Sequence, residues 1–156
     1  MPKQRTLQEA YNEYESKGEF KDQEAANKEK IKLMIEISKA NLDSADLLKK
    51  NLETRSLQWC VIYKLYYDSL RELADALVLL DNKKILNHQG LFAYLCTKHP
   101  ELDLDWNFFE KVRTKRNGIN YYGTFVTANE FREIELQTEL YIKALEKAVK
   151  EKLIKN

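Results

Sequence analysis

The stretch RNGINYYG, residues 116–123, gathers side chains that bind phosphate groups and nucleobases. Its polar and aromatic residues are Arg116, Asn117, Asn120, Tyr121 and Tyr122. The basic run before it, KVRTKR, adds Arg113 and Lys115. A guanidinium binds phosphate through charge-assisted hydrogen bonds, and an aromatic ring stacks on a base. The stretch therefore favours a nucleotide or RNA site, although a basic run of this kind is also common on a solvated helix face.

Arg116 is the residue of this stretch that most needs a partner. On a helical wheel at about 100° per residue, it lies between Phe109 and Val112 on the apolar face. A guanidinium on a buried face is costly unless it is paired. Asp68 is the candidate partner, because together with Arg71 it interrupts an otherwise apolar helix. Such a pair would also exist in a purely structural network, so the functional and structural interpretations both stay open.

The overall composition limits the class of protein. A chain of 156 residues suits one domain, and with 44% hydrophobic residues, four glycines and two prolines it favours helices joined by few breaks. The formal net charge is +1, from 26 basic and 25 acidic residues. No overall field would draw this chain to nucleic acid or to a membrane surface, so a polyanion site has to be local.

The sequence gives no sign of a membrane, a metal or a cofactor. The longest apolar run, WCVIY at residues 59–63, is far too short to span a bilayer, and residues 1–18 contain no apolar leader segment. Cys60 and Cys96 lie in separate apolar segments without a C-x-x-C motif or a His/Cys cluster. We therefore expect a cytoplasmic protein with reduced thiols, no metal, no cofactor and no membrane contact.

The first half of the chain predicts two long helices. Apolar residues recur at helical spacing over residues 22–51 and again over residues 56–80, where Ser56 is a plausible N-cap. The second of these helices is the more hydrophobic, so we expect it at the centre. A short leading helix is expected to stop at Gly18.

The second half predicts three more helices with clear ends. Asn87 can cap a short helix that Pro100 terminates, and a helix over residues 106–122 can end at Gly123 in a left-handed conformation. A capping box at Thr127 begins the last helix. Because short connections force neighbouring helices to reverse, we expect an all-α, antiparallel up-and-down bundle of four to five helices.

The order of these motifs resembles the HEPN domain family (higher eukaryotes and prokaryotes nucleotide-binding). A tyrosine-rich helix, YKLYYDSLRELADALVLL, is followed by NHQGLFAYL and then by KRNGINYYG. The family signature is an arginine, often followed by asparagine, with a histidine four to six residues further on. Arg116 and Asn117 match this signature, Asp68 matches the polar position of the second helix, and His88 is similar to the histidine of the third. The resemblance implies a single HEPN-like bundle over residues 22–154, after an N-terminal extension or short helix over residues 1–20.

The resemblance also implies a function. Members dimerise with their motifs facing each other across a shared cleft, and active members are metal-independent ribonucleases, many of them toxins encoded beside a nucleotidyltransferase antitoxin. The catalytic positions would be Arg116, Asn117 and Tyr121, supported by Asp68, Arg71 and His88. A homodimer interface would also bury five tyrosines, which are more aromatic surface than one small bundle easily buries. These are Tyr63, Tyr66, Tyr67, Tyr121 and Tyr122.

The histidine of the signature is absent from this chain. Asn120, Tyr121 and Tyr122 occupy its window, and a tyrosine with a pKa of about 10 is a poor base near pH 7. We therefore expect binding of RNA or a nucleotide, or docking of a nucleotidyltransferase, through a cleft formed by residues 116–122, without efficient catalysis. One alternative is a ribonuclease toxin of a toxin–antitoxin pair, whose base comes from elsewhere, for example His88. Another is a helical interaction module with a structural Arg116.

Overall fold

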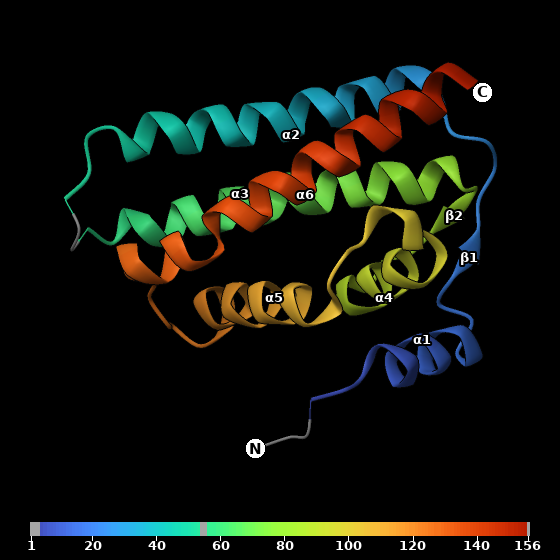
Figure 1. The fold of residues 1–156 in the computed structure, drawn as a ribbon, viewed down its shortest axis with the longest axis horizontal. Coiled ribbons are helices and arrows are strands. Elements are labelled where there is room, and N and C mark those ends of the chain that lie inside the picture. Colours follow the sequence, from blue (N-terminus) through green and yellow to red (C-terminus); the bar gives the residue numbers. More distant parts are fainter. Residues whose placement is uncertain (1–3, 54–55, 156) are drawn as a thin grey trace.

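The computed structural model describes residues 4–53 and 56–155, and it confirms the predicted all-α bundle (Figure 1). The described residues form five helices after an N-terminal one, six in all. They are α1 (Leu7–Ser16), α2 (Lys28–Lys49), α3 (Gln58–Leu80), α4 (His88–Lys98), α5 (Trp106–Tyr121) and α6 (Ala128–Lys155). A 3-10 turn, η1 (Pro100–Leu102), lies between α4 and α5.

Helix α3 is the central helix, as its apolar composition predicts. It packs against α2 and α6 along its length and also against α4 and α5. Fourteen of its 23 residues are buried, and three tyrosines are among the largest fully buried side chains of the described chain. Burial of apolar area on every side of one helix supplies the main stabilisation of the bundle.

Neighbouring helices reverse direction where short loops join them. Ser38 contacts Ser69, and Lys49 contacts Tyr66, so α2 runs antiparallel to α3. Lys111 of α5 pairs with Glu133 of α6, whereas Lys115, later in α5, pairs with Glu130, earlier in α6. Helix α5 is therefore also antiparallel to α6. Figure 1 shows both reversals by the progression of colour along the chain.

Helices α3 and α6 lie side by side and run in the same direction. Tyr66 donates a hydrogen bond to Glu139, and Asp81, fifteen residues further on, pairs with Lys152. The intervening α4 and α5 return the chain to the beginning of α3 before α6 starts (Figure 1).

Most predicted helix ends are confirmed by hydrogen bonds. The Asn87 side chain accepts from the Gly90 amide, and Thr127 and Glu130 form the reciprocal capping box. Gly123 has a φ of 64°, the left-handed value that ends α5. Ser56 lies two residues outside α3 and accepts from the Gln58 amide, so this helix begins slightly later than predicted.

The predicted start of the first long helix at residue 22 is wrong. Lys21–Asp22 forms β1, which pairs antiparallel with β2 (Lys83–Lys84), and Asn27 caps α2 instead. Asn82 adopts a φ of 61° directly after α3, which turns the chain back toward β1. In the described part of the chain, no helix carries a stretch long and apolar enough to cross a membrane.

Candidate phosphate-binding site around Arg116

Arg116 lies on the face of α5 that contacts α3, as the helical wheel predicts. Its guanidinium carbon stands 5.2 Å from the centre of the Tyr67 ring, and its Nη2 atom is 4.0 Å from Oδ1 of Asp68. The predicted pair with Asp68 is therefore present, at the outer limit of an ion pair. The side chain of Arg116 is 18% exposed, which leaves part of it within reach of a ligand.

The hydrogen bonds of Arg116 are incomplete. Within residues 4–53 and 56–155, its Nε atom is buried and has no hydrogen-bond partner. The 4.0 Å contact to Asp68 is too long for a hydrogen bond. A buried donor without a partner is costly, so this arrangement favours an acceptor that arrives with a ligand.

The other basic residues of α5 are paired within the chain. Arg113 donates from Nε and Nη2 to the two oxygens of Glu110, both at 2.9 Å. Lys115 pairs with Glu130, and on the same face Lys111 lies 3.5 Å from Glu133. These pairs neutralise most of the basic run that precedes the motif.

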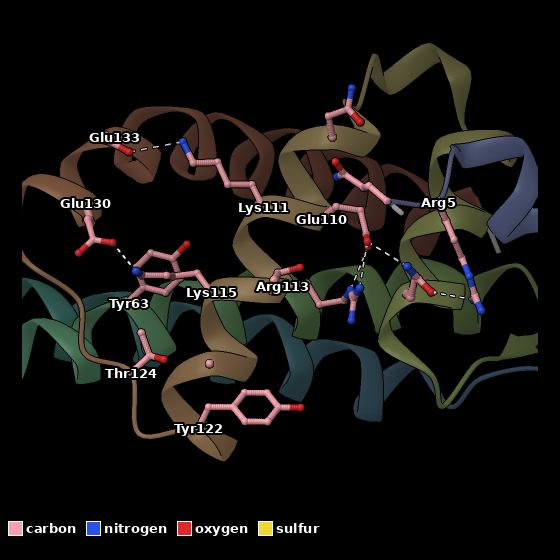
Figure 2. A pocket seen from close by; sticks show the side chains of 15 residues that line it. Arg5, Tyr63, Glu110, Lys111, Arg113, Lys115, Tyr122, Thr124, Glu130 and Glu133 are labelled. Atoms are coloured by element: carbon pink, nitrogen blue, oxygen red, sulfur yellow. Dashed lines mark hydrogen bonds and ion pairs between the residues drawn. The ribbon is translucent and has the colours of Figure 1, made fainter. Parts of the chain in front are cut away.

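This paired face of α5 lines an open cleft of about 980 Å³, shown in Figure 2. Arg113, Lys115 and Tyr122 contribute to it, whereas Arg116, Asn117, Asn120 and Tyr121 do not. The predicted site residues are thus divided between two faces, because successive residues of a helix turn by about 100°. The cleft of Figure 2 therefore contains only part of the predicted set.

The residues at the end of α5 are open to solvent. Tyr121 and Tyr122 are 69% and 81% exposed, Asn120 is exposed and Asn117 is half-buried. In Figure 2 the ring of Tyr122 projects from the last turn of α5. These side chains border Arg116 along the chain and could stack on or bond to a base held beside it.

Tyr67 connects Arg116 to His88. The Tyr67 hydroxyl is hydrogen-bonded to Nδ1 of His88 at 2.9 Å, and the Tyr67 ring is fully buried beneath the guanidinium. Burial lowers the pKa of His88 to about 4, helped by the charges of Arg71 and Arg116. His88 is therefore a neutral imidazole at pH 7.

The three residues expected to support the motif lie around Tyr67. Asp68 reaches Arg116 directly, and His88 does so through Tyr67. Arg71 is held by Asp75, with Nη1 2.7 Å from Oδ2, and acts on His88 only through its charge. The structure places these residues near one another, with Tyr67 as the link that the sequence interpretation left unassigned.

Glu110 is a buried residue that sequence reasoning missed. It is 4% exposed and binds Arg113 and the Nε2 amide of Gln89. Gln89 in turn accepts from Tyr14 at 2.7 Å and from Arg5 at 3.2 Å, which ties the N-terminal segment to α5. The spacing of Glu110 and Arg113 at i and i+3 was the available signal for this pair.

The expectation of a large exposed tyrosine surface is only partly met. Tyr63, Tyr66 and Tyr67 are at most 1% exposed, because four helices cover α3. Tyr121 and Tyr122 remain on the surface, together with Phe125 at 63% exposure. The aromatic surface that could support a dimer is therefore smaller than the sequence suggested.

Comparison of the chain with protein-family models, with curated proteins and with solved structures finds no match.

Proposed function

We propose that this chain is a HEPN-like protein that binds RNA or a nucleotide through the α3–α5 surface centred on Arg116, without efficient catalysis. The observation that carries the proposal is the Arg116 guanidinium, whose Nε has no partner in the described residues although its basic neighbours are paired. A phosphate oxygen would supply the missing acceptor.

The surroundings of Arg116 support this choice of ligand. The Tyr67 ring holds the guanidinium from one side, which reduces the freedom lost on binding. Asn117, Asn120 and Tyr121 follow on the exposed end of the same helix and offer amides and a ring to a base. Arginine, amide and aromatic groups are the usual means of holding single-stranded RNA.

The ribonuclease alternative lacks a suitable base in this arrangement. His88 is close to Arg116 through Tyr67, but with a pKa of about 4 it accepts a proton weakly at pH 7. Tyr121 and Tyr122 are exposed to water and have no contact that would activate their hydroxyl groups in the described structure. Binding is therefore favoured over cleavage.

The proposal includes a partner and a location. Three exposed aromatic residues lie at and just after the end of α5, and such residues suit an interface with a second copy of the chain or with a nucleotidyltransferase. They are Tyr121, Tyr122 and Phe125. We also propose a cytoplasmic location. Light scattering that gives the mass of a monomer at all concentrations would remove the homodimer.

Binding of a labelled, mixed-sequence single-stranded RNA, followed by fluorescence anisotropy in the presence of a chelator, tests the proposal. We expect Arg116→Ala to weaken binding about tenfold, because it removes a charged contact of about 1.4 kcal/mol. The affinity of Arg116→Lys for RNA should lie between those of the wild type and Arg116→Ala, since lysine keeps the charge without the planar stacking on Tyr67. Arg132→Ala, at an exposed arginine of α6, is the matched control and should bind as the wild type does.

Two results would contradict the proposal. If Arg116→Ala binds RNA like the wild type but unfolds more easily, Arg116 is a structural residue and the interaction-module alternative is correct. If the wild type cuts the RNA in chelator and Arg116→Ala does not, the protein is a metal-independent ribonuclease.

A further inference from the structure

A second pocket, separate from the cleft of Figure 2, lies between α2, α3, β2 and the start of α4. Its volume is about 340 Å³, near the lower end of the range for small-molecule sites. Lys30, Arg71, Lys83 and Lys84 line it, with Asp75 as the one carboxylate among the lining residues. The pocket is thus strongly cationic in a chain whose formal net charge is only +1.

Two of these cations form no ion pair with the described residues, although the charge of Lys30 acts on Asp75. Arg71 is paired with Asp75, and Lys83 lies 2.6 Å from Asp22 of β1. Within residues 4–53 and 56–155, neither Lys30 nor Lys84 forms an ion pair, and both are exposed. An anion in the pocket would therefore meet two available ammonium groups.

The fold places these charges beside a helix N-terminus. Pairing of β1 with β2 fixes the backbone of Lys83 and Lys84. His88, which also lines the pocket, is the first residue of the 11-residue α4, whose dipole is positive at this end. Lys30 of α2, the lysines of β2 and the N-terminus of α4 thus add positive potential to one pocket.

The remaining wall is apolar. Met34 of α2 and Val78 of α3 line the pocket with Ile85 and Leu86, and Leu86 is 69% exposed. A large aliphatic residue left exposed at a pocket rim is suited to cover the apolar part of a ligand. The pocket is therefore cationic on one side and apolar on the other.

We infer that this pocket binds a small organic phosphate of the nucleoside monophosphate class, with the phosphate between Lys30 and Lys84 and the base against Met34 and Leu86. The site does not include Arg116, although it shares Arg71 and His88 with the group around Tyr67. It provides a place for a free nucleotide that is distinct from the proposed RNA surface.

Asp75 gives the proposal a second, opposite test. Burial raises the pKa of its carboxyl to about 6, and the charge of Arg71 acts against this rise. Asp75 is thus mostly ionised at pH 7.5 and opposes an incoming phosphate. Asp75→Asn removes this charge and should tighten binding, whereas loss of the lysines should weaken it.

Isothermal titration calorimetry with adenosine monophosphate at pH 7.5 is the experiment, with adenosine as the uncharged comparison. We expect saturable binding of the monophosphate to the wild type, about tenfold tighter than adenosine. The Lys30→Ala, Lys84→Ala double variant should lose about tenfold in affinity. The Lys39→Ala, Lys143→Ala double variant removes two exposed lysines outside the pocket and should bind like the wild type.

Several results would overturn the inference. Absence of saturable binding, equal affinity for adenosine, or equal losses in the two double variants would show that the pocket does not hold a phosphate. Loss of binding in Arg116→Ala, with no loss in Lys30→Ala, Lys84→Ala, would move the ligand to the α5 surface. Retained nucleotide binding in Arg116→Ala alongside lost RNA binding would support both proposals, so the two can fail separately.

Discussion

At the scale of single residues, the ring of Tyr67 explains why arginine suits position 116 better than lysine. The planar guanidinium carbon lies 5.2 Å from the ring centre, a distance at which the guanidinium interacts with the face of the ring. A lysine ammonium is a compact point charge that cannot use this surface in the same way. Arg116→Lys therefore loses the contact with the ring although it keeps the charge.

Glu110 should contribute strongly to stability. Its carboxylate is buried and receives three hydrogen bonds, two from Arg113 and one from Gln89. We expect Glu110→Ala to lower the free energy of unfolding by about 3 kcal/mol, because it leaves the half-buried Arg113 without its counter-charge. Urea denaturation measures this loss. Glu133→Ala, in an exposed pair with Lys111, is the control and should cost less than about 0.5 kcal/mol.

A loss below about 1 kcal/mol for Glu110→Ala would mean that water or another group satisfies Arg113. Glu110→Gln keeps an acceptor for Arg113 and should therefore fall between the wild type and Glu110→Ala.

At this scale, the sequence predicted which helix face a side chain lies on better than it predicted the residues that the side chain contacts. The helical wheel placed Arg116 on the apolar face of its helix, and the polar interruption of the second helix suggested Asp68 as its partner. It could not predict the bond from Tyr67 to His88, which depends on how α4 packs against α3. It also could not predict which basic residues are neutralised, since Glu130 and Glu133 belong to α6.

At the scale of elements, two serines set the approach of α2 to α3. Ser38 and Ser69 are 2% and 0% exposed, and their hydroxyl oxygens lie 2.6 Å apart. Each hydroxyl lies within hydrogen-bond distance of the backbone carbonyl of the other serine, on the facing helix. Small side chains at such a crossing allow close packing of the two backbones.

Enlarging Ser38 should therefore be worse than removing its hydroxyl. We expect Ser38→Ala to cost about 1 kcal/mol of unfolding free energy, for the lost hydrogen bond. Ser38→Leu should cost about 3 kcal/mol, because the added carbons have no space between α2 and α3. Thermal and urea unfolding, with the exposed Glu36→Leu as control, give the comparison. Equal stability of the alanine and leucine variants would show that the crossing is not tightly packed.

The elements themselves were largely predictable because their ends carry local signals. Asn87, Thr127 and Gly123 form the caps that their residue types indicate. The β1–β2 pair was not predictable, since residues 21–22 and 83–84 are short, polar and far apart in sequence. The same non-local pairing accounts for the wrong start of α2.

At the scale of the whole molecule, Asp81 joins three helices at one end of the bundle. It follows α3 directly, and its carboxylate pairs with Lys152 of α6, with Tyr94 of α4 and with Nε2 of His99 at 2.6 Å. The hydrogen bond to Asp81 raises the pKa of His99 above its ordinary value of 6.5. The protonated form of His99 is thus stabilised by folding.

This arrangement predicts a pH dependence of stability above pH 6.5. Because the pKa of His99 is higher in the folded state, its contribution is complete below pH 6.5 and is lost as the pH rises through the folded pKa. We expect the wild type to lose stability as the pH rises above 6.5, measured by urea unfolding. His99→Gln should lose the pH-dependent part. A wild-type decline retained in full by His99→Gln would assign the effect to another group.

The most direct test of the account is an NMR titration of the arginine Nε–H groups with single-stranded RNA. The chain has only six arginines, so Arg116→Lys can assign the Arg116 signal by its disappearance. Binding through Arg116 predicts a saturable shift of its Nε–H resonance, at concentrations where Arg132 on α6 does not respond. An Arg116 signal that stays unchanged while RNA binds would contradict the account.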